Sequence, residues 1–169
     1  MDSGIAAVRR PYDLRQFRHP GIPRLTIYHV PNFIDATGWV IYERPRSEGF
    51  GLQTVTWHQK KDGERIQNLM TGESLSESPE PTLTEDYFDI GSDWVRSQIA
   101  AMMEISIPLH TERPIGLDGE SFGVHMRGEF DVEWWCDGPE AWRPLIDWTR
   151  ECIAYLNQIR GEQDIVPNP

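Results

Sequence analysis

The stretch from Ser121 to Ile159 constrains the fold most, because two alternating apolar segments are followed at once by a helical apolar pattern. The alternating apolar residues are Phe122, Val124 and Met126, then Phe130, Val132 and Trp134. Alternation with a period of two is typical of strands that bury one face and expose the other. The stretch therefore predicts a β-hairpin that runs into an amphipathic helix.

The register of this hairpin follows from keeping its apolar side chains on one face. That requirement pairs Val124 with Val132 and closes the hairpin with a three-residue loop, Arg127-Gly128-Glu129. Gly128 stands one place earlier than the usual left-handed position of such a loop, so the turn type stays open.

The opposite face of the hairpin is polar under this register. His125 faces Asp131, and Glu133 and Trp135 follow on the same side. One interpretation is a solvated face whose His–Asp pair contributes about 0.2–1 kcal/mol. The other is a binding surface, because an acidic strip beside an outward-facing Trp is common at interfaces.

The helix after the hairpin is predicted from Pro139 to Ile159, with Gly161 ending it. Its apolar positions recur at three- and four-residue steps: Trp142, Leu145, Ile146, Thr149, Ile153 and Leu156. A second helix is expected over 94–107, with apolar positions at Val95, Ile99, Met102 and Met103. Each pattern predicts one face packed against a sheet.

Four further strands are predicted from β-branched and aromatic runs, at 25–30, 38–44, 51–59 and 65–70. Asp62-Gly63 is expected to form the tight turn before the fourth. Short links favour antiparallel pairing. The expected fold is α+β, a mostly antiparallel sheet of about six strands with two helices packed on one face. We expect an Arg-rich arm over 1–24, one domain over 25–160 and a loose tail over 161–169.

Residues 71–89 change in character, because they combine acids with Pro79 and Pro81 and contain no base. We expect a mobile, solvated loop here. A second interpretation is an acidic lure for a basic partner, and the candidate binding residues in the segment are Glu77, Glu80, Glu85 and Asp86.

The charge of the 169-residue chain is strongly negative, with 27 acidic residues against 16 basic ones and a formal net charge of −11. Such a protein repels nucleic acid and anionic membranes and attracts basic proteins. No apolar run suggests a signal peptide or a membrane span. Two cysteines without metal spacing are consistent with free thiols in the cytoplasm.

Catalytic patterns are weak in this sequence. It has no glycine-rich phosphate loop, no nucleophile elbow and no His-Glu-x-x-His zinc helix. The best candidate is Asp131 and Glu133 beside His125, whose carboxylates could hold a divalent cation. A nuclease of that type would also use a nearby Lys, and both Lys residues lie at 60–61. We therefore expect no cofactor and no resident metal, and we favour a binder over an enzyme.

The chain resembles the small, acidic, cytoplasmic immunity proteins that neutralise bacterial toxins. The resemblance rests on its size, its α+β order, its acidic segments and the Trp-rich run EWWCDGPEAW at 133–142. It implies a binding protein that covers the active site of a basic toxin.

The partner-binding residues we expect are His125, Glu129, Asp131, Glu133 and Trp135, together with Glu77, Glu80, Glu85 and Asp86. The alternatives are a metal-dependent enzyme on the His125 face and a structural subunit of an assembly. The sequence leaves the partner and the oligomeric state open.

Overall fold

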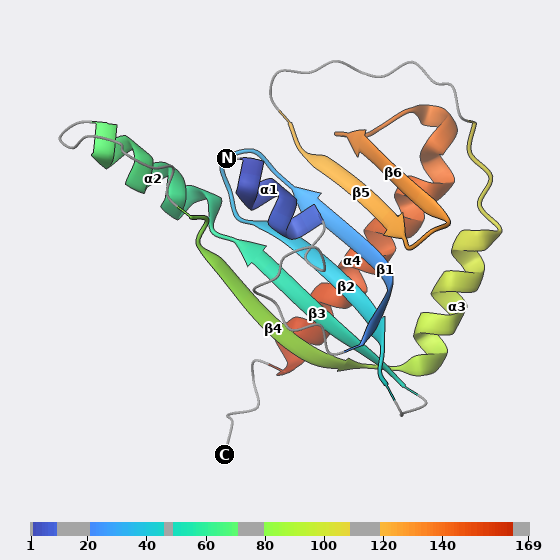
Figure 1. Cartoon of the computed structure of the whole chain (residues 1–169). Coiled ribbons are helices and arrows are strands. Elements are labelled where there is room, and N and C mark those ends of the chain that lie inside the picture. Colours follow the sequence, from blue (N-terminus) through green and yellow to red (C-terminus); the bar gives the residue numbers. More distant parts are fainter. Residues whose placement is uncertain (1, 10–20, 46–48, 71–79, 109–118, 164–169) are drawn as a thin grey trace.

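The protein folds around one antiparallel sheet, as the computed structural model in Figure 1 shows. The structure describes residues 2–9, 21–45, 49–70, 80–108 and 119–163. The sheet order is β4-β3-β2-β1-β5-β6. The strands are β1 (Ile22–Val30), β2 (Ala36–Glu43), β3 (Phe50–Trp57), β4 (Leu83–Ile90), β5 (Ser121–Met126) and β6 (Phe130–Trp135). The predicted α+β class and six-stranded antiparallel sheet are confirmed.

Four α-helices accompany the sheet in the described residues, two more than the sequence predicted. They are α1 (Asp2–Arg9), α2 (Gln59–Met70), α3 (Ser92–Met103) and α4 (Arg143–Gln163), and the short helix η2 (Glu140–Trp142) precedes α4. In Figure 1, α1 lies in front of the sheet, α4 behind it, and α2 extends beyond the end of β3 and the start of β4. Residues 2–9 of the expected arm are therefore helical.

Three local predictions between β3 and α3 are wrong. Residues 65–70 belong to α2 and are not a strand, and Asp62-Gly63 lies in the first turns of that helix. The Asp62 carboxylate is held by Trp57 and Thr82, so its side chain ties α2 to two strands instead of shaping a turn. The sixth strand of the sheet is β4, in the segment expected to be a loop.

The acidic residues of β4 are compatible with a strand because β4 is an edge of the sheet. Its buried side chains are Phe88 and Ile90, whereas Glu85 and Asp86 are half-buried and Asp89 is exposed. Charged residues on edge strands also discourage pairing with other chains. Residues 71–79, the other half of the expected loop, lie outside the described residues.

Each face of the sheet has its own apolar cluster, because side chains alternate along every strand. The α4 face carries Leu25 and Ile27 of β1, which join a cluster with Val95 and Met102 of α3 and with the apolar side of α4. The α1 face carries Tyr28 and Val30 of β1, Ala36 and Trp57, which pack against Val8 of α1. Met103, which we expected on the buried face of its helix, is 62% exposed and lies outside both clusters.

The hairpin register is the one predicted. Val124 pairs with Val132, and His125 pairs with Asp131. Val124 is fully buried and Val132 half-buried. Gly128 has φ +78°, and the Glu129 amide donates to the Met126 carbonyl oxygen at 3.1 Å. These features define a type II turn, which resolves the turn type that the sequence left open.

The last helix departs from prediction at its end. α4 continues through Gly161 to Gln163. A glycine inside a helix costs about 1 kcal/mol relative to alanine. Leu145, Leu156 and Ile159 bury this helix against the sheet, and that packing outweighs the local cost of Gly161.

Candidate functional site

The polar face of the β5–β6 hairpin is arranged as predicted, but some of its side chains already have partners within the chain. His125 Nδ1 lies 3.7 Å from Asp131 Oδ2 across the hairpin. Glu133 forms an ion pair with Arg9 at the end of α1. Trp135 is half-buried on the same side, and Glu129 is exposed in the turn. The acidic strip is thus partly neutralised before any partner arrives.

Tyr28 completes this arrangement on the α1 face. A Cβ atom at Gly123 would lie 2.1 Å from the Tyr28 ring, so the ring rests directly on the glycine. The guanidinium of Arg9 lies 5.4 Å from the centre of the same ring. Burial raises the pKa of Tyr28, and the charge and hydrogen bond of Glu133 raise it further. Arg9, Tyr28 and Glu133 therefore form one packed polar cluster between α1 and the hairpin.

The other predicted binding residues lie elsewhere. Glu80 precedes β4, and its carbonyl oxygen accepts a hydrogen bond from Arg65 at 2.6 Å. Glu85 lies on the α1 face and bonds to Gln53 and Tyr87. Asp86 lies on the α4 face of the same strand. Glu77 lies outside the described residues.

The two acidic sets do not form one surface. β4 and β6 are opposite edges of the sheet. Five strand spacings of 4.7–4.9 Å separate them, a distance of about 24 Å. The single acidic surface expected from the sequence therefore divides into two separate groups of residues.

The described part of the chain gives no support to the alternative of a metal-dependent enzyme. No group of three or more His, Cys, Asp or Glu side chains is placed there to hold a metal ion. On the hairpin face, the carboxylate of Glu133 is already engaged by Arg9.

A different site, which the sequence reasoning missed, lies where the β1–β2 loop meets the end of β3. The side chains of Phe33 and Ile34 project from this loop and are 76% and 58% exposed. We call these two residues the tip. Phe33 has φ +63°, a left-handed conformation that is rare for a bulky residue. The tip is therefore an exposed apolar feature built on strained backbone.

Gln59, the first residue of α2, holds the tip with both ends of its amide. Its Oε1 accepts a hydrogen bond from the Phe33 amide at 3.0 Å, and its Nε2 donates to the Pro31 carbonyl oxygen at 3.4 Å. The loop is thus fixed by side-chain contacts from the element that follows β3, and Phe33 is kept at the surface.

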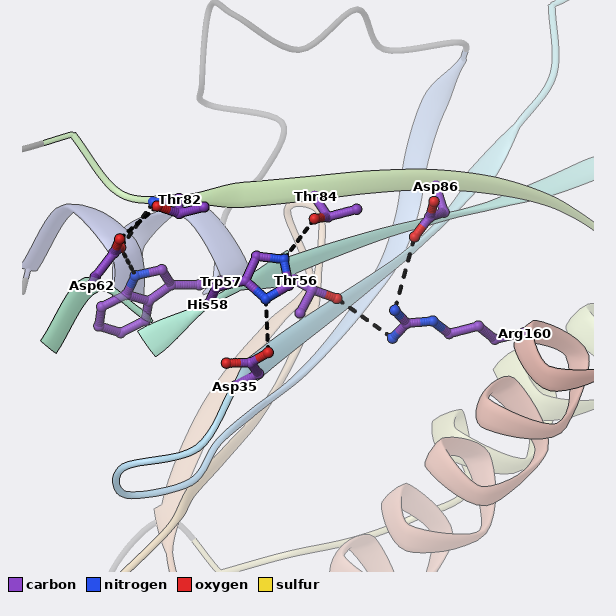
Figure 2. Close-up of polar contacts among 9 residues, drawn as sticks. All are labelled: Asp35, Thr56, Trp57, His58, Asp62, Thr82, Thr84, Asp86 and Arg160. Carbon is purple, nitrogen blue, oxygen red and sulfur yellow. Dashed lines mark hydrogen bonds and ion pairs between the residues drawn. The ribbon is translucent and has the colours of Figure 1, made fainter. Parts of the chain in front are cut away.

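Next to the tip, three polar side chains form a hydrogen-bonded relay. His58 Nδ1 lies 2.7 Å from Asp35 Oδ2, and His58 Nε2 lies 2.6 Å from Thr84 Oγ1. Figure 2 shows the imidazole between the carboxylate and the hydroxyl. A carboxylate only accepts hydrogen bonds, so Nδ1 carries a proton, and in the neutral imidazole Nε2 then accepts from the hydroxyl of Thr84. We call Asp35, His58 and Thr84 the relay.

A cationic side chain lies beside the relay. Arg160 extends from α4 toward β3 and β4, as Figure 2 shows. Its Nη1 lies 3.5 Å from Thr56 Oγ1, and its Nη2 lies 3.9 Å from Asp86 Oδ2. Thr56 is directly opposite Thr84 in the β3–β4 ladder. Both contacts are long, so the guanidinium is only loosely held against Thr56 and Asp86.

The position of the relay depends on the polar contacts of Asp62. Its carboxylate accepts hydrogen bonds from Trp57 Nε1 at 2.8 Å, from the Thr82 amide at 2.8 Å and from Thr82 Oγ1 at 2.6 Å. Burial acts to raise the pKa of Asp62, but the bonds from Thr82 and Trp57 outweigh it, and the pKa is lowered. These bonds join β3, α2 and the start of β4 on either side of His58.

No sequence signal marks the relay. Asp35, His58 and Thr84 are separated by 23 and 26 residues. They belong to a loop, a strand end and a segment expected to be unstructured. The exposed tip had a weak signal, because Pro31-Asn32-Phe33-Ile34 places two large apolar residues beside a turn-forming pair.

No protein-family model, curated protein or solved structure matches this chain. In the described parts of the chain, none of the helices combines the length and the apolar character needed to cross a membrane.

Proposed function

We propose that this protein is a binding protein for a basic partner, and that the tip formed by Phe33 and Ile34 is its apolar anchor. The observation that carries the proposal is the 76% exposure of Phe33 in a left-handed conformation. Holding a bulky residue there costs about 1–3 kcal/mol, and such strain gathers at recognition sites. Gln59 keeps the strained loop in place, so the ring is preorganised for contact.

The tip is a stronger anchor than Trp135, which the sequence suggested. Trp135 is half-buried beside Gly119 and Cys136. Interface hot spots bury large apolar side chains that were exposed before binding. Phe33 and Ile34 offer more apolar area to a partner than Trp135 does.

Charge supports a basic partner in this proposal. The net charge of −11 accelerates encounter with cationic proteins and disfavours acidic ones. The resemblance to immunity proteins makes the proposal more specific: the partner is a basic toxin, and this protein covers its active site. A cytoplasmic location belongs to the proposal, and the free thiols of Cys136 and Cys152 support it.

The test is binding kinetics with the purified basic protein encoded by the neighbouring gene, at two salt concentrations. Phe33→Ala is expected to weaken binding by about 2 kcal/mol or more, which is about 30-fold in Kd, mainly through faster dissociation. Higher salt is expected to slow association, because it screens the attraction between the two charged proteins.

The matched control is Ile22→Ala. Ile22 is 49% exposed and lies at the opposite end of β1 from the tip. This variant should bind like the unaltered protein. Equal affinities of Phe33→Ala and the unaltered protein, or association that ignores salt, would overturn the proposal. Trp135→Ala in the same assay compares the two candidate anchors directly.

A further inference from the structure

We propose that the relay is a hydrolytic site for small carboxylic esters, with Thr84 as the nucleophile and His58 as the general base. This activity goes beyond partner binding and rests on separate observations. The relay joins an acid, an imidazole and a hydroxyl through contacts of 2.7 and 2.6 Å. This is the order of groups that activates a hydroxyl nucleophile, with the base oriented by a third residue.

Three neighbouring strands bring Asp35, His58 and Thr84 together. Asp35 immediately precedes β2, His58 immediately follows β3, and Thr84 is the second residue of β4. The backbone of His58 donates to the Thr82 carbonyl oxygen at 2.9 Å, which fixes the end of β3 against the start of β4. The hydroxyl and the imidazole are therefore placed by the β3–β4 ladder, a more rigid support than a loop.

Access supports the assignment. Thr84 is exposed, and the side chain of His58 is 32% exposed. Both side chains are thus open to solvent, so a small ester can approach the relay from outside. An open site also excludes little water and holds substrate weakly, so we expect a rate that rises linearly with ester concentration.

The reaction balances with water as the second reactant. Thr84 Oγ1 bonds to the carbonyl carbon while its proton moves to His58 Nε2. The bond from that carbon to the alcohol oxygen then breaks, and His58 returns the proton to the departing alcohol. Water attacks the acyl-threonine in the same way, and the carboxylic acid leaves as Thr84 regains its proton.

Arg160 provides for the negative charge that develops on the carbonyl oxygen. Its guanidinium contacts Thr56, opposite Thr84, and Asp86, two residues further along β4. With contacts of 3.5 and 3.9 Å it can turn toward an oxyanion without losing a strong bond. Donors placed where charge develops are often the largest contribution to catalysis of this type.

The test uses the full chain and p-nitrophenyl acetate, with release of p-nitrophenol as the readout. Thr84→Val and His58→Gln should each lower the second-order rate constant about tenfold or more, since a positioned base contributes about 10²–10⁴-fold. Thr84→Ser keeps the hydroxyl and should keep the activity. Mass spectrometry after an acid quench should find an acetyl group on Thr84.

His29→Gln is the matched control for reaction at surface imidazoles. His29 Nε2 lies 2.6 Å from Glu120 Oε2, so it also pairs with a carboxylate, but its ring stacks on Phe122 instead of meeting a hydroxyl. This variant should hydrolyse the ester like the unaltered protein. A Thr84→Val protein that remains folded and equally active, or acetylation confined to other residues, would overturn the proposal.

Asp35 is a positioning residue in this scheme, because it acts through His58. Asp35→Asn should lower the rate and also change the tautomer of His58, since an amide can donate to Nδ1 where the carboxylate could only accept. Imidazole ¹⁵N chemical shifts report the tautomer directly. An unchanged tautomer in Asp35→Asn would contradict the orienting role.

Discussion

The indole Nε1 of Trp57 donates a 2.8 Å hydrogen bond to the carboxylate of Asp62, five residues further along the chain. The same carboxylate accepts two hydrogen bonds from Thr82. One buried acid thus joins the end of β3, the first turns of α2 and the approach to β4. The relay and the tip both lie next to this junction.

Removing this carboxylate should destabilise the protein. Asp62→Ala leaves the indole N–H and the Thr82 groups without their acceptor, and hydrogen bonds to a charged group are each worth about 1.5–3 kcal/mol. We expect a loss of at least about 2 kcal/mol in the free energy of unfolding, measured by urea denaturation. Exposed Glu64 in the same helix is the control, and Glu64→Ala should change stability little.

The same junction predicts a pH dependence. The folded-state pKa of Asp62 is lowered, so its contribution is complete above the unfolded value of about 3.9 and is lost as the pH falls below it. Stability should therefore fall more steeply with acidification in the unaltered protein than in Asp62→Asn. Parallel stability curves for the two proteins would contradict this assignment.

Because the backbone of the tip is strained, removing the Phe33 side chain should stabilise the protein. Phe33→Gly should raise the free energy of unfolding by up to about 1 kcal/mol, because glycine adopts positive φ without steric cost. Phe33→Ala keeps a Cβ atom and should bring no such gain. Denaturation midpoints of the two variants separate the effect of backbone strain from the loss of the ring, and a Phe33→Gly protein less stable than Phe33→Ala would show that φ is not strained.

Two glycines should respond in opposite ways to the same substitution. Gly123→Ala places a Cβ atom 2.1 Å from the ring of Tyr28 and should destabilise by about 1–3 kcal/mol. Gly63 has no atom within 4 Å of an added Cβ and lies inside α2, so Gly63→Ala should stabilise by up to about 1 kcal/mol. Thermal unfolding of both variants tests the packing of Tyr28 on the hairpin.

The ion pair between Arg9 and Glu133 should contribute modestly. Its side chains are 33% and 43% exposed, so solvent screens the pair. A double-mutant cycle with Arg9→Gln and Glu133→Gln should give a coupling energy of about 0.2–1 kcal/mol that shrinks in high salt. Arg96 and Asp93, a more exposed pair at 3.5 Å, should give none. A coupling energy of zero for Arg9 and Glu133 would show that this ion pair does not help to hold α1 on the sheet.

The hairpin could be predicted to the residue because its information is local. Apolar and polar residues alternate along both strands of the hairpin, and only one register keeps the apolar residues on the same face. The helical periodicity of α4 was equally clear, and Leu145, Ile146 and Leu156 are fully buried as expected. In these segments, local pattern and tertiary packing favour the same structure.

Tertiary structure decided the elements for which the local pattern was ambiguous. Asp62-Gly63 is a common turn dipeptide, yet bonds from Trp57 and Thr82 place it in a helix. The acids of β4 suggest a loop, yet pairing with β3 makes a strand whose charges lie at the edge of the sheet. These outcomes depend on partners that are distant in the sequence.

By itself, then, the sequence determined the α+β class, the antiparallel sheet, the hairpin register and the buried side of the last helix, because periodicity encodes which side chains leave water. It could not determine that Asp35, His58 and Thr84 meet, or that Glu133 is paired with Arg9. Those contacts join segments whose separation in the chain carries no periodic signal. The strand order β4-β3-β2 brings the relay together, and the packing of α1 on the sheet brings Arg9 to Glu133.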